Sequence, residues 1–203
     1  MTIERGSAFG RAGELSPDGI TVRSDSQARQ TIESAWLLDD PLPELGLLGG
    51  DLCRTLGGSG VEDRLRTSSA MRFPIDLGVI EFGRERHCFI AHAVMRRRGW
   101  LGRGVVAMNA QWLGEWDLGP RSHPNDGLLD VTDGAVPFGE RRQARQRAKT
   151  GSHLPHPGLH SSRVTSIDLR FDRPLGIWLD GAKVGRSTDV HLEIQPDAFI
   201  VVI

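Results

Sequence analysis

The stretch IDLRFDRPLGIWLDG, residues 167–181, decides the fold class. Apolar residues occupy alternate positions on both sides of Pro174 and keep one phase throughout: Ile167, Leu169, Phe171, Leu175, Ile177 and Leu179. Polar or small residues fill most of the positions between them. Successive side chains of a strand point to opposite faces of a sheet, so this pattern predicts strands with one buried face.

Similar short runs occur on both sides of this stretch. They are residues 75–79, 88–90, 105–108, 128–131, 190–194 and 199–203, separated by turn residues such as Gly83-Arg84. Many short strands with frequent turns are typical of an all-β sandwich or barrel, expected here from about residue 70 to 203. Residues 138–150 are the exception, because they read as a helix whose only apolar interior positions are Ala144 and Ala148.

The first third of the chain has a different residue pattern, in which strands alternate with helices. A short strand at 20–22 precedes a helix at 24–36, which Ser24 or Asp25 can cap. A second strand at 45–48 precedes a short helical pattern, and this order favours a parallel strand pair. We therefore expect an α+β, mostly β fold, in which a small truncated α/β N-terminal part packs on a larger C-terminal antiparallel β-sandwich. The expected divisions are 1–18 (irregular lead-in), 19–68 (nucleotide-binding-like remnant) and 69–203 (β-sandwich).

Composition limits the function classes. The 203 residues carry a formal net charge of −1, so no global charge favours nucleic acid as a partner. The two cysteines, Cys53 and Cys88, form no CxxC motif, which argues against a disulfide scaffold or a cysteine-based zinc site. The N-terminus lacks the apolar segment of a signal peptide, so we expect a cytoplasmic protein.

The stretch LGLLGGDLCRTLGG, residues 45–58, combines a strand, a glycine turn and a helix start. Free N–H groups at a helix start attract anions, and Gly49 and Gly50 would let a phosphate come close. Asp51 would repel that phosphate unless a cation such as Mg²⁺ lay between them. The alternative is that Asp51 only caps the short helix.

The order of motifs resembles the diacylglycerol kinase-like lipid kinases, relatives of sphingosine kinases and more distantly of NAD kinases. HPNDGLLDV at 123–131 is similar to the family's DDGxLDV segment, and Leu179-Asp180-Gly181 is similar to its DGE strand. FPIDLG at 73–78 is similar to the entry strand of the second domain. Residues 46–57 are similar to a shortened form of the G-T-G-N-D-F-A-R-x-L-G loop.

The resemblance implies roles for individual residues. Catalytic roles fall to Asp25, Asp51 and Asp180, and phosphate or nucleotide binding falls to Gly49, Gly50 and Arg54. A structural Mg²⁺ would be held by the Asp126 side chain and the carbonyls of His123 and Leu128. The alternative for this last segment is a plain Asn-Asp-Gly turn.

The departures from the family pattern concern the ATP site. The GGDGT loop is replaced by Arg23-Ser24-Asp25-Ser26-Gln27, the DGE glutamate is replaced by Ala182, and few residues precede Ile20. We therefore predict a diacylglycerol kinase-like protein with a degenerate ATP site that binds a lipid or a partner. The alternatives are an active ATP-dependent kinase of a diacylglycerol-like hydroxyl, and a regulatory or structural subunit of another kinase.

Three further features carry hypotheses about partners. The basic segment 140–149 suggests peripheral contact with a lipid or membrane surface, against the alternative of a solvated helix face. His153, His156 and His160 suggest zinc, against an ordinary polar loop. His92, in an apolar stretch, reads as a satisfied buried histidine. A truncated front part would leave a sheet edge, which makes a homodimer or a kinase partner reasonable.

Overall fold

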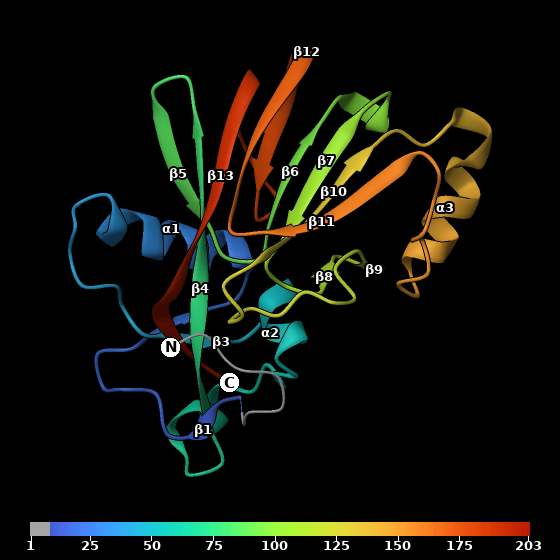
Figure 1. Ribbon diagram of the computed structural model, residues 1–203. Helices are drawn as coiled ribbons and strands as arrows, with labels where there is room; N and C mark the ends of the chain where they lie inside the picture. The colour runs from blue at the N-terminus through green and yellow to red at the C-terminus, as the bar shows by residue number, and fades with distance from the viewer. Residues whose placement is uncertain (1–8) are drawn as a thin grey trace.

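The computed structural model describes residues 9–203 as one mixed 11-stranded sheet, a small two-stranded sheet and short helices (Figure 1). The main sheet has the order β1-β4-β13-β12-β6-β7-β10-β11, with β5 beside β4 and the pair β2-β3 joined to β13. The mostly β class is therefore confirmed. No helix in the described part of the chain has the length and apolar character needed to cross a membrane.

The strands of the main sheet are β1 (Arg11–Ala12), β2 (Ile20–Val22), β3 (Leu45–Leu47), β4 (Met71–Phe82), β5 (Glu85–Phe89), β6 (His92–Arg96), β7 (Gly104–Met108), β10 (Leu129–Gly134), β11 (Leu159–Val164), β12 (Ser166–Leu179) and β13 (Ala182–Val202). The second sheet is the hairpin β8 (Trp112–Leu113) and β9 (Trp116–Asp117). The helices are α1 (Asp25–Trp36), α2 (Asp51–Thr55) and α3 (Arg141–Ala148), with 3-10 turns at Glu62–Arg66, Arg98–Trp100 and Phe138–Glu140.

The N-terminal unit follows the predicted order β2-α1-β3-α2. Ser24 is the N-cap of α1, and its hydroxyl accepts a hydrogen bond from the Gln27 N–H at 3.2 Å. This cap leaves the neighbouring Asp25 carboxylate available for other contacts. Strands β2 and β3 are parallel, as the alternation of strands and helices predicts.

The two parts of the molecule share one sheet. Strand β3 pairs in parallel with the end of β13, where Val201 lies opposite Leu45. One hydrophobic core then runs from α1 across β3 to β4 and β13, and it includes Ile32, Leu45 and Phe199. The N-terminal part is therefore joined by backbone hydrogen bonds as well as by packing, and the division between residues 68 and 69 stays a prediction.

The alternation in residues 167–181 is confirmed by burial. Leu169, Phe171, Leu175, Ile177 and Leu179 of β12 all lie in the main core of the antiparallel region. The pairing with β13 shifts register between Arg170 and Leu175, around Pro174. A proline lacks an N–H donor, so an irregularity at this point is expected.

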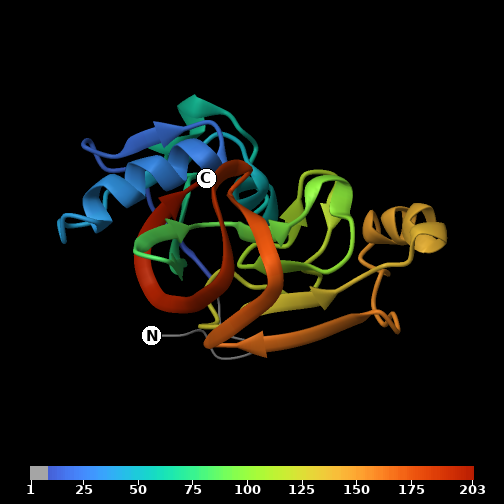
Figure 2. The ribbon, with the colours of Figure 1, turned by 90° about the horizontal axis from the view of Figure 1, so that it is seen from above.

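The hairpin β8-β9 and the helix α3 lie outside this core. Figures 1 and 2 show α3 at the opposite side of the molecule from α1, beyond the edge of the strands β10 and β11. The opposite face of β6 and β7 carries its own small apolar cluster, which includes Val106, Trp100 and Leu118. The β8-β9 hairpin and α3 are therefore two segments that lie against the sheet outside its main core.

Candidate active site

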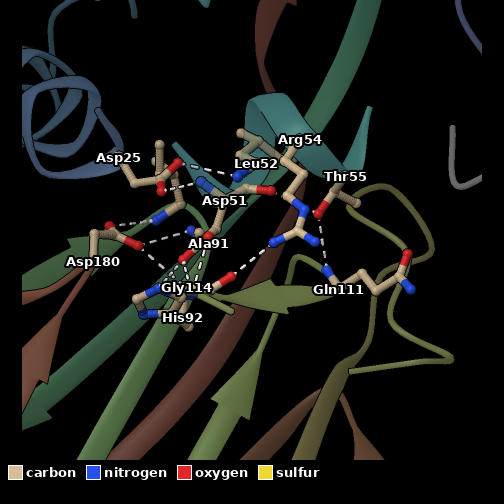
Figure 3. A network of polar contacts seen from close by, with 11 residues as sticks. Asp25, Asp51, Leu52, Arg54, Thr55, Ala91, His92, Gln111, Gly114 and Asp180 are labelled. Carbon is tan, nitrogen blue, oxygen red and sulfur yellow. Dashed lines mark hydrogen bonds and ion pairs between the residues drawn. The ribbon is translucent and has the colours of Figure 1, made fainter. Parts of the chain in front are cut away.

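Asp25 begins α1 and points toward the start of α2 (Figure 3). Its Oδ2 accepts the Asp51 N–H at 2.5 Å, and its Oδ1 accepts the Leu52 N–H at 3.1 Å. The carboxylate thus takes the two amide groups that an external anion would use at the glycine turn. The loop that resembles a phosphate-binding loop therefore binds the Asp25 side chain of the same chain.

Two glycines permit this approach. A Cβ atom on Gly50 would lie 2.5 Å from Asp25 Oδ1, and Gly50 also has a positive φ of 98°. A Cβ on Gly49 would lie 2.6 Å from the carbonyl oxygen of Arg23. Both glycines therefore let the loop before α2 lie against the loop before α1, and their role in nucleotide binding stays a prediction.

Asp51 connects α2 to two distant segments. His92 Nε2 donates to its Oδ2 at 3.1 Å, and the Gly114 N–H donates to the same oxygen at 2.9 Å. Burial alone would raise the pKa of Asp51, but the hydrogen bonds from His92 and Gly114 outweigh it and lower the pKa. Asp51 is therefore more than a helix cap: it is an anchor between α2, β6 and the β8-β9 turn.

Asp180 fixes the chain reversal that precedes β6. Its carboxylate accepts the backbone N–H groups of Ile90, Ala91 and His92 at 2.9, 2.9 and 3.0 Å. Asp180 is buried and has a positive φ of 48°, which places it in the tight turn between β12 and β13. Burial raises the pKa of this carboxyl group despite its three hydrogen bonds.

These residues form one group, which we call the acidic cluster: Asp25, Asp51, His92 and Asp180. Burial, followed by the charge of Asp180, raises the pKa of Asp25 to about 6. Burial alone would lower the pKa of His92, but the hydrogen bond to Asp51 and the charges of Asp180, Asp51 and Asp25 raise it overall. The cluster is thus a buried set of acids balanced by one histidine.

The position of His92 could not be read from its local sequence. Its neighbours are apolar, and its partner Asp51 lies far away along the chain. It is buried as predicted, but its Nδ1 has no hydrogen-bond partner in the described residues. It therefore belongs to the candidate site and is only partly satisfied.

Within residues 9–203, one group has the proximity expected of metal ligands. Ligand atoms of Asp25, Asp51 and His92 all lie within 4.8 Å of one another. Two carboxylates suit Mg²⁺ or Mn²⁺, and an imidazole suits a transition metal better than Mg²⁺. The donor set fits a divalent cation, which these three residues would hold. The triad His153, His156 and His160 forms no such group, and His156 Nε2 contacts Glu140 at 2.9 Å.

Arg54, one turn after Asp51 in α2, contacts the β8-β9 hairpin. Its Nη1 donates to the Gly114 carbonyl at 2.8 Å, and its guanidinium carbon lies 3.5 Å from the centre of the Trp112 ring. Thr55 Oγ1 also accepts the Gln111 N–H at 3.0 Å. These contacts hold the hairpin over α2, so Arg54 has a structural partner in the place of a phosphate.

The Asn-Asp-Gly turn lies elsewhere and is held by Asp76. The Asp76 carboxylate accepts the Gly127 N–H at 2.7 Å and the Asn125 side-chain amide at 3.2 Å. Asp126 accepts the Leu128 N–H at 3.1 Å and forms an ion pair with Arg163. A guanidinium thus contacts the carboxylate that the resemblance assigns to Mg²⁺. His123 accepts the Asn125 N–H at 3.2 Å, and the metal at this turn stays a prediction.

The fold and the cluster define an architecture: a large, mostly antiparallel β-sheet region joined to a small α/β unit, with acidic residues at the junction. Residues 85–203 match the family described as the YegS C-terminal NAD kinase beta sandwich-like domain. This match covers more than half of the chain, so the chain belongs to that family.

Comparison with solved structures agrees with this assignment. A diacylglycerol kinase from Bacillus anthracis str. Sterne is similar at 15% identity with a TM-score of 0.63, over 91% of this chain and 75% of the other. Two more structures from that organism, each assigned to the diacylglycerol kinases, give TM-scores of 0.67 and 0.66 at 15% and 14% identity. Both cover 91% of this chain and 77% of the other. At this identity the likeness shows the fold. A comparison with curated proteins gives no match.

Proposed function

We propose that this diacylglycerol kinase-like protein binds a lipid or a partner without transferring phosphate from ATP. The observation that supports the proposal most strongly is the contact of Asp25 with the amides of Asp51 and Leu52. A nucleotide phosphate at this turn would have to displace a buried carboxylate or lie against it. Displacement would take two amide donors from the Asp25 carboxylate, and a phosphate lying against it would be repelled by a like charge in a poorly hydrated site.

The loop before α1 supports the same conclusion. Ser24 and Ser26 stand where the family pattern has glycines, and the Ser24 hydroxyl is already used as the α1 cap. Phosphoryl transfer depends mainly on positioning and charge neutralisation. Removal of one preorganised donor typically costs ~2.7–4 kcal/mol of transition-state stabilisation, and several are altered here together.

The test is isothermal titration of the protein with ATP and Mg²⁺, and separately with ADP and Mg²⁺. We expect no binding heat up to millimolar nucleotide. Binding at micromolar concentration that disappears in both Asp25→Ala and Asp51→Ala would overturn the proposal. Asp168→Ala, which changes an exposed carboxylate of β12, is the matched control.

A second candidate is an active ATP-dependent lipid kinase. The specific observation in its favour is the convergence of Asp25 and Asp51 on His92, because a divalent cation held there would reverse the local charge. A phosphorylation assay with dioctanoylglycerol, ATP and either Mg²⁺ or Mn²⁺ tests it. Product formation by the wild type that Asp51→Asn abolishes would support the kinase over the binding protein.

A partner subunit or a homodimer is a third candidate. Among the described strands, β2 pairs with β3 alone, so it has one edge without a strand partner. Ile20 on this strand is exposed, as are Leu37 and Leu38 after α1. Light scattering after size exclusion tests self-association: a dimer that Ile20→Lys disrupts would support a β2 interface.

A further inference from the structure

The segment that contains the β8-β9 hairpin is closed at its base and held at its tip by separate contacts. At the base, the Gly119 N–H donates to the Gln111 carbonyl at 2.9 Å. At the tip, Gly114 has a positive φ of 58° and its backbone groups contact side chains of α2 (Figure 3). We call residues 111–119 the hairpin lid. Because the base bond and the β8-β9 pairing lie within the lid, it can move as a unit once its contacts with α2 are lost.

Two charged side chains of α2 hold the tip of the lid. The Gly114 N–H donates to both oxygens of Asp51, at 3.1 Å to Oδ1 and 2.9 Å to Oδ2. Arg54 Nη1 donates to the Gly114 carbonyl at 2.8 Å, and the same guanidinium lies over the ring of Trp112. The closed position of the tip therefore depends on a helix of five residues, one of which belongs to the acidic cluster.

The Asp51 carboxylate is shared between the lid and the group of candidate cation ligands. Ligand atoms of Asp25, Asp51 and His92 lie within 4.8 Å of one another. Asp51 Oδ2 accepts hydrogen bonds from His92 Nε2 and from the Gly114 N–H. The other oxygen, Oδ1, also accepts the Gly114 N–H. A cation held by the three side chains would therefore use an Asp51 oxygen to which the lid is already bonded.

A cation and the Gly114 N–H compete for this carboxylate. The hydrogen of an amide carries partial positive charge, so a cation bound to the same oxygen at ~2.0–2.6 Å repels it. This repulsion is stronger inside a protein than in water, because the effective dielectric constant is lower. Gly114 itself is exposed, so its N–H can bond to water after it leaves Asp51. Opening of the lid therefore buries no unsatisfied donor at the tip.

We propose that residues 111–119 are a lid which Asp51 holds closed, and that a divalent cation bound by Asp25, Asp51 and His92 releases it. Within residues 9–203, the side-chain hydrogen bond and the ring contact of Arg54 are both with the lid. Release therefore also uncovers this guanidinium. The inference goes beyond the proposed function, because it concerns the cation alone and requires no nucleotide.

The test is hydrogen exchange of the full chain, measured by mass spectrometry with and without millimolar MnCl₂. Mn²⁺ is the probe because it accepts both carboxylate and imidazole ligands. We expect Mn²⁺ to increase exchange in residues 111–119 at least fivefold and to leave exchange in β12 unchanged. Calorimetry on the same protein measures binding of the cation itself. The absence of binding heat at millimolar Mn²⁺, or binding without faster exchange in the lid, would overturn the proposal.

The variant Asp51→Asn tests whether the cation acts through this side chain. An amide oxygen can still accept the Gly114 N–H, but a neutral amide is a weaker cation ligand than a carboxylate. We expect Mn²⁺ to produce no increase in lid exchange in this variant. Asp168→Asn, which changes an exposed carboxylate of β12, should respond to Mn²⁺ as the wild type does. A full response in Asp51→Asn would overturn the assignment of the lid contact to Asp51.

Two threonines test the coupling from the side of the lid. Thr55 Oγ1 donates to the Asp51 carbonyl at 2.7 Å, and Thr31 Oγ1 donates to the Gln27 carbonyl at 3.0 Å, each four residues back in its helix. Only Thr55 also accepts a lid N–H, that of Gln111 at 3.0 Å. Thr55→Val weakens the closed lid without a change of charge. Because coupling between two equilibria is reciprocal, we expect it to bind Mn²⁺ at least threefold more tightly than the wild type.

Thr31→Val is the matched control and should leave the affinity for Mn²⁺ unchanged. Trp112→Leu, which removes the ring beneath Arg54, is a second neutral variant and should also tighten Mn²⁺ binding, so the test holds if Thr55→Val does not fold. Unchanged affinity in both lid variants would overturn the coupling. The nucleotide titration is a separate measurement: ATP binding with a lid that responds to Mn²⁺ would refute the proposed function alone, and no ATP binding with an unresponsive lid would refute the lid alone.

Discussion

The acidic cluster and the pocket beside α3, which is lined by Trp100, Trp116, Ala148 and His153 among others, differ in how their polar groups are satisfied. In the cluster, the carboxylates of Asp25, Asp51 and Asp180 each accept two or more hydrogen bonds from backbone amides or His92. Beside α3, neither nitrogen of His153 has a hydrogen-bond partner in residues 9–203. The carboxylates of the cluster are thus satisfied by the protein's own groups, whereas the buried imidazole of His153 is not satisfied by any described residue.

The variant Asp180→Ala is expected to have the largest effect on stability among the tests of this comparison. Hydrogen bonds to charged groups contribute ~1.5–3 kcal/mol each, and Asp180 accepts three from residues 90–92. We expect a loss of at least about 3 kcal/mol in the free energy of unfolding by urea, in line with a purely structural anchor. Asp168→Ala, which removes an exposed ion pair with His191, should cost about 1 kcal/mol or less. Equal losses in both variants would contradict the structural role of the cluster.

A pH series tests Asp25. Its pKa of about 6 lies above the ordinary value of 3.8, so the native state holds the proton more strongly than the unfolded state does. Its contribution to stability is present below pH 3.8 and is lost as the pH rises toward 6. At ~1.36 kcal/mol per pKa unit, the change amounts to at most about 3 kcal/mol.

The measurement is urea unfolding of the wild type and Asp25→Asn between pH 4 and 7. The stability of the wild type relative to the variant should decrease as the pH rises. Asp18→Asn, which alters an exposed carboxylate between β1 and β2, is the matched control. A relative stability that increases with pH would mean that Asp25 is stabilised as a carboxylate, for example by a cation.

The glycine turn offers a smaller test. Gly50→Ala combines a positive φ with a Cβ placed 2.5 Å from Asp25 Oδ1, whereas Gly57→Ala has a positive φ of 78° and open space around it. Left-handed backbone costs a non-glycine residue ~1–2 kcal/mol. We expect Gly57→Ala to show that cost in thermal unfolding and Gly50→Ala to exceed it by about 1 kcal/mol or more. Equal costs would mean that Asp25 can move away from the turn.

The smallest predicted effect is a gain in stability, whereas the variants above lose stability. His153→Leu removes two buried nitrogen atoms that have no hydrogen-bond partner in the described residues, and such groups typically cost ~1–3 kcal/mol. We expect the variant to be about 1 kcal/mol more stable than the wild type in urea unfolding. His156→Leu, which removes the contact with Glu140, is the control and should not gain stability.

The sequence predicts the fold better than the site, for a physical reason. Strand alternation and the Ser24 cap are local signals, and the structure confirms both. The contact of His92 with Asp51 depends on how β6 is placed against α2, which no local pattern encodes. The lack of a hydrogen-bond partner for His153 in the described residues is equally hidden, because Pro155 and Pro157 after it are typical of an ordinary loop. Contacts between residues far apart in the sequence are therefore the part of the site that the sequence does not predict, whatever the residue types.

The parallel pairing of β3 with the end of β13 also bears on synthesis. Leu45 leaves the ribosome well before its partner Val201 is made. Contacts between residues so distant in sequence slow folding, since a large loop must close before they form. The nascent N-terminal unit therefore keeps one edge of the apolar strand β3 unpaired until β13 is made, although β2 can already pair with the other edge. Chaperone demand should be concentrated in that interval, and early truncation of β13 should leave β2 and β3 prone to aggregation.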